Sequence, residues 1–207
     1  RFMTAVAARC SQMLNVAEIA QDADINQKQA KDWLHILETL GIIFYLHPYS
    51  NNLLKRLVKT PKLYFYDTGL VCYLTKWSSA EVLEYGAMNG AILENYVVSE
   101  IAKTYLNTGS EPFLYYYRDK DAKEIDIVLE QDGVLNPIEI KKTSNLYRSD
   151  LDYLNGVFLI RADPEQQVHL QRLHKIRFQP CALIRFVLRI GRERIRFTPL
   201  GFIPLSL

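Results

Sequence analysis

Apolar residues recur every three or four positions in two neighbouring segments near the start of the chain. The first, "NVAEIAQDADI" (residues 15–25), opens with Asn15 and has Glu18 three residues later, the arrangement of a capping box at a helix N-terminus. The second, residues 26–41, begins with another asparagine and ends at Gly41, a residue that favours helix termination. Two short helices joined by a tight turn predict a helix-turn-helix.

A hairpin should follow the second helix. Two β-prone runs, residues 42–46 and 63–66, flank a polar loop, which is typical of a hairpin. A hairpin directly after the second helix predicts a winged helix-turn-helix, to which we assign residues 1–79 as an N-terminal domain. One face of the second helix is lined by Ala30, Trp33, Leu34, Leu37 and Leu40.

Basic residues gather in this first domain, although the net charge of the 207 residues is only +2. Between Pro48 and Tyr66 there are four cations and no acid, a local pattern that favours contact with phosphate groups. The alternative is a solvated face of a module that packs against another protein domain. In the first interpretation DNA is the partner, and the contacting residues are Gln27, Lys28, Gln29 and Lys31 on the second helix and Lys55, Arg56, Lys59 and Lys62 in the hairpin.

From residue 80 onward, helical and β-prone segments alternate. The segments predicted as strands are residues 112–118, two runs within 124–143, then 156–163 and 181–190, and those predicted as helices are residues 89–107 and 164–176. Mixed strands and helices at this spacing predict an α+β or α/β fold around one mixed sheet. We assign residues 80–207 to this second domain.

Two carboxylates lie in segments that otherwise have the apolar pattern of buried strands. Asp126 stands between isoleucines in "EIDIVLE", and Glu139 stands between isoleucines in "IEIKK". The Asp132-Gly133 pair between the two segments favours a type I′ hairpin turn. With these two residues as the turn, Asp126 should lie directly opposite Glu139.

The same register makes two further predictions. Ile127 should face Ile138, and Glu124 should face Lys141. Because side chains alternate along a strand, the charged residues of both strands should project from one face of the sheet. Pro137 is the residue that argues against this register, since proline in a sheet favours an edge or a bulge.

Two carboxylates directly opposite each other on neighbouring strands repel, so their position requires an explanation. Across a hairpin their β-carbons lie about 5 Å apart, and like charges at that distance are destabilising unless a cation sits between them. Oxygen ligands at about 2.1 Å would suit Mg²⁺. The alternative is that this face is the wet side of a half-exposed sheet, with Glu124 and Lys141 as a surface ion pair.

A resemblance to known enzymes favours the metal site. Glu94 on a helix, Asp126 on a strand, and "EIK" at residues 139–141 on the next strand resemble the PD-(D/E)xK nuclease motif, which occurs in restriction enzymes and Holliday junction resolvases. The resemblance implies a restriction-endonuclease-like fold and Mg²⁺ (or Mn²⁺) bound by the three carboxylates and the main-chain carbonyl of Ile140. It also implies that Lys141 orients the attacking water or the scissile phosphate.

A wider resemblance covers roughly residues 1–143. "LLKRLVKTPKLYFYDTGLVCYL", "GAILENYVVSEI" and "EIDIVLE…IEIKKT" are similar to the C-terminal half of AAA-type ATPases that carry domain of unknown function 4143. In such proteins a P-loop ATPase precedes a winged helix and a nuclease-like domain, so the ATPase domain of the same protein is an implied partner. This chain has no GxxxxGK[ST] motif, so we expect no ATP chemistry from it. Over residues 146–176 the resemblance fades.

Composition indicates the cellular compartment of the protein, but it does not identify the function. The three cysteines are widely spaced and have no CxxC pattern, which is typical of a reducing compartment. No apolar run approaches a membrane span and no secretory signal precedes the first helix, so we expect a cytoplasmic protein without a membrane partner. Two functions remain open: a metal-dependent phosphodiesterase, and a non-catalytic DNA-binding or docking module with a nuclease-like fold.

Overall fold

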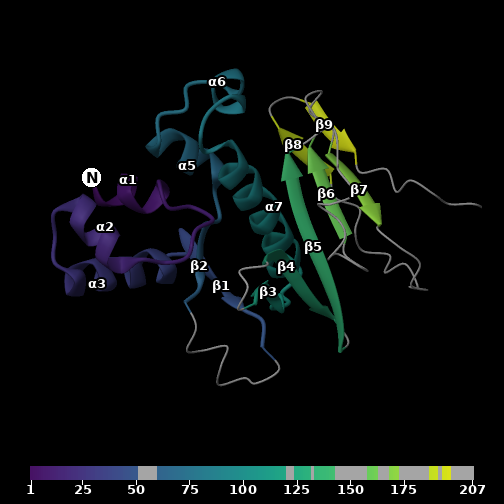
Figure 1. The fold of residues 1–207 in the computed structure, drawn as a ribbon, viewed down its shortest axis with the longest axis horizontal. Coiled ribbons are helices and arrows are strands. Elements are labelled where there is room, and N and C mark those ends of the chain that lie inside the picture. Colours follow the sequence, from purple (N-terminus) through teal and green to yellow (C-terminus); the bar gives the residue numbers. More distant parts are fainter. Residues whose placement is uncertain are drawn as a thin grey trace, which may run out of the picture.

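The structure is a computed structural model. It describes residues 1–50, 60–119, 124–131 and 133–142, together with the backbone of four strands nearer the C-terminus. Figure 1 shows the arrangement: a group of short helices at the N-terminal side, a long helix, and a twisted sheet.

The N-terminal helices begin where the capping residues predict. Helices α1, α2 and α3 span Phe2–Ala7, Val16–Ala23 and Gln27–Thr39. The side chain of Asn15 accepts a hydrogen bond from the backbone N–H of Glu18 at 3.2 Å, and the side chain of Asn26 accepts one from Gln29 at 2.8 Å. Both predicted N-caps are therefore confirmed, and each satisfies one of the N–H groups that a helix leaves without an internal partner.

The buried face of α3 is narrower than its apolar pattern predicts. Ala30, Leu34 and Leu37 are buried, whereas Trp33 is 37% exposed and Leu40 is 67% exposed. Leu40 is the C-cap residue and lies past the last helical turn that packs on the core. Trp33 packs at its edge against the ring of Phe2, with ring centroids 5.1 Å apart. The predicted apolar face is therefore buried only in part.

Seven strands of the described chain form one mixed sheet in the order β2-β1-β3-β4-β5-β6-β7. Their bounds are Ile43–Pro48 (β1), Lys62–Phe65 (β2), Leu114–Arg118 (β3), Glu124–Gln131 (β4), Val134–Lys142 (β5), Phe158–Ala162 (β6) and Val168–Arg172 (β7). β1 and β2 are the antiparallel pair predicted after α3. β1 also pairs in parallel with β3, through His47 with Tyr115 and Pro48 with Tyr116, so this pair extends the sheet.

The outer edge of the sheet at β2 is covered by the segment between α1 and α2. Ser11 and Leu14 donate backbone hydrogen bonds to the carbonyls of Leu63 and Pro61, both at 2.8 Å, and Leu63 donates one to Gln12 at 2.9 Å. Unpaired strand edges can recruit other chains. At β2 the backbone groups of the edge are occupied by the protein itself.

The two faces of the β1–β2 pair meet different helices. Three further helices are α5 (Thr68–Leu74), α6 (Ala80–Glu84) and α7 (Asn89–Leu106). On one face Leu46 and Tyr64 join a core with α7 and with strands β3 to β5. On the other, Ile43, Leu63 and Phe65 pack with α1, α2, α3 and α5. Because side chains alternate, Lys62 shares the α7 face with Tyr64.

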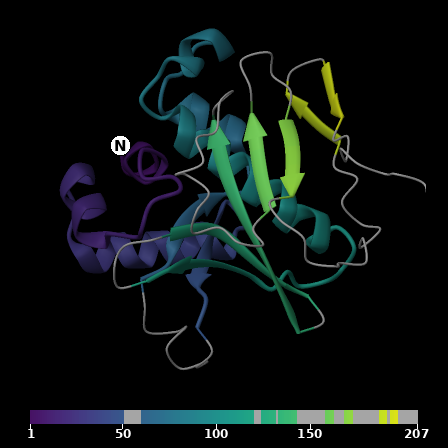
Figure 2. The same cartoon turned by 45° about the vertical axis from the view of Figure 1, so that its right-hand side comes forward.

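The β4–β5 hairpin has the predicted register over the paired part of its length. The pairing runs from Gln131 opposite Val134 to Ile127 opposite Ile138, and it includes Pro137 without a shift. Gly133 has φ of +75°, as a type I′ turn requires, while Asp132 lies outside the described residues. The paired ladder ends at Ile127 and Ile138, although both strands continue, and Figure 2 shows the two strands separating away from the turn.

One predicted element is wrong. The helix expected over residues 164–176 contains strand β7, which pairs antiparallel with β6. In "VHLQR" the apolar residues Val168 and Leu170 alternate with polar ones, which is a strand period rather than a helical one. Strands β8 (Val187–Ile190) and β9 (Glu193–Arg196) form a separate antiparallel pair. The predicted domain boundary after residue 79 stays a prediction.

Asn95 connects α7 to β2 and α5, which predicts a large effect of its removal. It is fully buried, accepts a hydrogen bond from the backbone N–H of Phe65 at 2.7 Å, and donates to the carbonyl of Phe65 at 3.1 Å and to the hydroxyl of Thr68 at 2.9 Å. Asn95→Ala should lower the free energy of unfolding in urea by about 2–4 kcal/mol, since it leaves buried polar groups without partners. The control Asn107→Ala, at the exposed end of the same helix, should change it by less than about 0.5 kcal/mol. Equal effects of both changes would contradict this role of Asn95.

Candidate functional site

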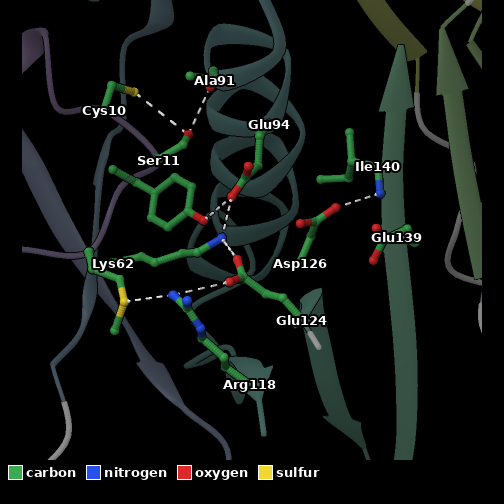
Figure 3. A network of polar contacts seen from close by, with 12 residues as sticks. Cys10, Ser11, Lys62, Ala91, Glu94, Arg118, Glu124, Asp126, Glu139 and Ile140 are labelled. Atoms are coloured by element: carbon green, nitrogen blue, oxygen red, sulfur yellow. Dashed lines mark hydrogen bonds and ion pairs between the residues drawn. The ribbon is translucent and has the colours of Figure 1, made fainter. Parts of the chain in front are cut away.

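The site lies where β2, α7, β4 and β5 come together (Figure 3). Lys62, at the start of β2, is only 4% exposed. Its ammonium lies 3.0 Å from Oε1 of Glu94 on α7 and forms a second ion pair with Oε1 of Glu124 on β4. The ammonium of Lys62 also lies over the ring of Tyr116, with Nζ 5.7 Å from the ring centroid. A buried ammonium is stable only with such compensation.

Glu94 is held by two donors at once. The Tyr64 hydroxyl donates to the same Oε1 atom at 2.6 Å. Both Lys62 and Tyr64 come from β2 and project toward α7 because they are two residues apart. The sequence predicted Glu94 as a site residue, and the structure places it in the same cluster as Asp126 and Glu124.

Asp126 occupies the gap where β4 and β5 separate. Its Oδ2 accepts a hydrogen bond from the backbone N–H of Ile140 at 2.8 Å. In a regular ladder that N–H would bond to a backbone carbonyl of β4. The paired residues end at Ile127 and Ile138, so the prediction that Asp126 pairs directly with Glu139 is replaced by this side-chain contact. The carboxylate takes the place of a strand carbonyl and so accounts for the opening of the hairpin.

Glu139 and Lys141, both on β5, form an ion pair at the site. Lys141 Nζ lies 2.7 Å from Glu139 Oε1. Glu139 is 3% exposed, and its other oxygen, Oε2, is buried with no hydrogen-bond partner among the described residues. The side chain of Lys141 is 41% exposed. A buried carboxylate oxygen without a donor is rare in folded proteins and is normally satisfied by a proton, a cation or an ordered water.

The pKa values of these carboxylates are raised because the groups are removed from water and lie close together. Burial and, to a lesser extent, the neighbouring charge of Asp126 together raise the pKa of Glu139 to about 7, although the ion pair with Lys141 and the backbone N–H of Asp126 oppose them. Burial also raises the pKa of Asp126 against the hydrogen bond from Ile140, and raises that of Glu94 against the charge of Lys62. Burial alone would lower the pKa of Lys62, but Glu94 and Glu124 outweigh it and raise that pKa to about 12. The ammonium of Lys62 is therefore charged at neutral pH.

The predicted Glu124–Lys141 surface pair has a different form in the structure. Glu124 contacts Lys62 and also Arg118, whose Nη1 lies 3.7 Å from Glu124 Oε2. Lys141 contacts Glu139. Glu139 is therefore buried, while the side chains of Glu124 and Lys141 are 28% and 41% exposed, so the alternative of a half-exposed face holds for these two residues but not for Glu139.

A divalent cation between Asp126 and Glu139 would have these two carboxylates as its side-chain ligands. Glu139 Oε2 is an unpartnered buried acceptor, and it lies close enough to Asp126 for that carboxylate to raise its pKa. The carbonyl of Ile140 points to the same side of its strand as its N–H, toward β4. Within the described residues, however, no group of three or more Asp, Glu, His or Cys side chains is arranged to hold a metal ion. The donor set is thus two carboxylates and one carbonyl, with Glu94 engaged by Lys62 and Tyr64.

The residues predicted to contact nucleic acid fall into three groups. Gln27, Lys28 and Lys31 are exposed on α3. Lys55, Arg56 and Lys59 lie outside the described residues. Lys62 differs from the prediction, because it is buried and ion-paired inside the protein and its ammonium does not face solvent.

Sequence reasoning missed Lys62, Tyr64 and Arg118 as members of the carboxylate cluster. A signal was present for Lys62. In "KLYFY" it shares the inward face of an apolar strand with Tyr64, much as Asp126 and Glu139 interrupt theirs. An unpaired charge on such a face requires an opposite charge from elsewhere in the fold.

Comparisons with known proteins match the chain to two family models. Residues 89–198 match the family model of a domain of unknown function (DUF4143), and residues 1–81 match that of another (DUF8612). The chain belongs to the DUF4143 family. Uncharacterized proteins of Mycobacterium tuberculosis and Mycobacterium bovis are each 32% identical to it over 144 residues. That match covers 70% of this chain and 32% of each relative, so the chain spans about a third of the length of these curated relatives.

No solved structure matches it significantly. None of the described helices has the length and apolar character that crossing a membrane requires.

The raised pKa of Glu139 predicts that the protein loses stability as the pH rises. Its pKa is about 7 in the folded protein against an ordinary 4.5, so the native state binds more protons between these values. Its contribution is fully present below about pH 4.5 and is lost as the pH rises to about 7. In metal-free buffer this loss should amount to about 1–3 kcal/mol, measured by urea unfolding at several pH values.

Glu139→Gln should flatten this part of the pH profile, because the amide does not titrate. The exposed control Glu111→Gln should leave the profile of the wild type unchanged. A Glu139→Gln variant with the same slope as wild type would assign the titration to another group.

Proposed function

We propose that this chain is the C-terminal, DNA-associated part of an AAA-type ATPase and that it carries a metal-dependent phosphodiesterase site. The observation that carries the proposal is the unpartnered, buried Oε2 of Glu139 next to Asp126, with the Lys141 ammonium on the other oxygen. A proton, a cation or an ordered water would satisfy that oxygen, and the half-exposed Lys141 would lie at its solvent side. This order of groups, from buried carboxylates to an exposed lysine, suits a substrate that arrives from solvent.

Each residue of the proposed site would have its own role. Asp126 and Glu139, with the carbonyl of Ile140, would hold Mg²⁺ or Mn²⁺. When bound, such an ion lowers the pKa of a coordinated water and neutralises charge that develops on phosphate. Lys141 would orient the water or the scissile phosphate. Glu94 would act as an outer ligand, fixed in place by the hydroxyl of Tyr64.

The proposed winged helix-turn-helix, nuclease-like fold and ATPase partner domain are each supported by a separate observation. Helices α2 and α3, followed by the antiparallel β1–β2 pair, are compatible with a winged helix-turn-helix. A mixed sheet with α7 on one face is compatible with a restriction-endonuclease-like fold. The curated relatives are about three times as long as the matched region, which leaves room in them for an ATPase domain.

A non-catalytic docking module is the second candidate, and two observations favour it. The Oε1 atom of Glu94 is engaged by both Lys62 and Tyr64, so it is not available to a metal ion in this arrangement. In addition, Trp33, Ile36 and Leu40 are exposed along one flank of α3, which suits contact with protein more than with phosphate. Metal binding and DNA cleavage distinguish the two candidates.

Saturating Mg²⁺ or Mn²⁺ should raise the melting temperature of the wild type, since a ligand that binds only the native state stabilises it. Asp126→Asn should melt at or above wild type without metal, because the amide oxygen can still accept the hydrogen bond from Ile140 while the charge repulsion is gone. The same variant should lose most of the metal-induced rise. Thermal melts with EDTA or with added metal measure both effects.

Lys141→Ala tests the chemical step separately. It should keep the metal-induced rise, because an ammonium is not a ligand, and it should abolish cleavage of DNA. If wild type shows no metal response and Asp126→Asn melts lower, Asp126 is a structural acceptor for Ile140. The docking module would then be the correct function.

The exposed lysines of α3 predict a salt-dependent part of DNA binding. Each phosphate contact contributes about 0.9 to the slope of log K against log salt, so the double variant Lys28→Ala/Lys31→Ala should reduce that slope by about two. Lys76→Ala, which removes an exposed lysine near α5, should leave it unchanged. Fluorescence anisotropy with a labelled duplex at several salt concentrations measures the slope. An unchanged slope in the double variant would remove α3 from the interface.

A further inference from the structure

The cluster around Lys62 contains more negative charge than one divalent cation would need. Glu94, Glu124, Asp126 and Glu139 come together from α7, β4 and β5, and the carboxylate of Asp126 influences the pKa values of both Glu94 and Glu139. The cluster divides into two halves. Asp126 and Glu139 form one half, and Glu94 and Glu124 form the other, with the Lys62 ammonium between the latter two (Figure 3).

The position of the Lys62 ammonium is that of a bound cation. It contacts one carboxylate oxygen from α7 and one from β4, and Tyr64 donates to the α7 oxygen from the side. An ammonium lies about 2.8 Å from carboxylate oxygens, whereas Mg²⁺ or Mn²⁺ binds them at about 2.1 Å. The same two carboxylates could therefore hold a divalent ion after a shift of less than about 1 Å each.

We propose that Lys62 occupies a second cation position of the site, between Glu94 and Glu124, so that the native protein binds a single divalent ion at Asp126 and Glu139. The single ion rests on the function proposed above, while the role of Lys62 rests on its own contacts. Lys62 belongs to the N-terminal part matched by the other family model. The N-terminal part thus completes the charge balance of a site whose carboxylates all lie in the C-terminal part.

This arrangement predicts that a second divalent ion binds when the ammonium is removed with space left behind. Lys62→Ala deletes the charge and most of the side chain, leaving Glu94 and Glu124 facing a polar cavity. Lys62→Met deletes the charge but fills the same volume. In EDTA both variants should melt about 5–10 °C below wild type, because each leaves the partly buried Glu94 and Glu124 without their cation.

The test is a count of bound Mn²⁺ by equilibrium dialysis, with free Mn²⁺ read by electron paramagnetic resonance. We expect one ion in wild type, two in Lys62→Ala and one in Lys62→Met. Adding Glu124→Gln to Lys62→Ala should return the count to one. Mn²⁺ should also raise the melting temperature of Lys62→Ala by more than that of wild type or Lys62→Met.

Several outcomes overturn the proposal. Two ions in wild type would mean that Lys62 does not occupy the second position, and one ion in Lys62→Ala would make Lys62 a structural counter-ion only. No ion in wild type with one in Lys62→Ala would remove the proposed phosphodiesterase site but retain the inference about Lys62. If Lys62→Ala is recovered unfolded, refolding from urea with Mn²⁺ or with EDTA decides: recovery only with Mn²⁺ supports the proposal, and failure in both overturns it.

Discussion

The rest of the structure depends on the pairing of one buried ammonium with two partly buried carboxylates. Lys62, Glu94 and Glu124 come from β2, α7 and β4, three elements far apart in the sequence. A charge moved from water into a protein costs several kcal/mol unless it is paired, so none of these elements can lie in the interior without the others. The pairing fixes the N-terminal helices against the sheet through β2, and it sets the electrostatic conditions under which Asp126 and Glu139 are buried nearby.

The second constraint is the opening of the β4–β5 hairpin. A regular ladder would satisfy the N–H of Ile140 with a backbone carbonyl and would leave no room between the strands. Because Asp126 supplies the acceptor from its side chain, the strands can separate while the N–H remains bonded. Glu139, which precedes Ile140 on β5, has a buried oxygen without a hydrogen-bond partner among the described residues. The same departure from regular pairing thus creates the site and satisfies the backbone around it.

Local features of the fold were predictable from the sequence, and contacts between distant segments were not. The N-caps at Asn15 and Asn26 and the hairpin register up to Ile127 and Ile138 depend on neighbouring residues only. The register failed as a guide beyond that pair, since a side-chain contact replaced the ladder. Lys62 was predicted as a surface cation because nothing within its own segment reveals Glu94 or Glu124. The helix predicted over residues 164–176 failed because its strand period is short and its partner, β6, is needed to stabilise it.

The pairing of β1 with β3 has a consequence for how this chain can have been assembled in evolution. The two family models meet between residues 81 and 89, yet the sheet crosses that junction, since β1 and β2 precede it and β3 to β7 follow it. A genetic exchange at the junction would separate strands of one sheet and would part Lys62 from Glu94. Each half can therefore be inherited with a new partner only if that partner supplies matching strands and a matching buried charge. We therefore expect the two sequence families to occur in the same proteins and to be inherited together.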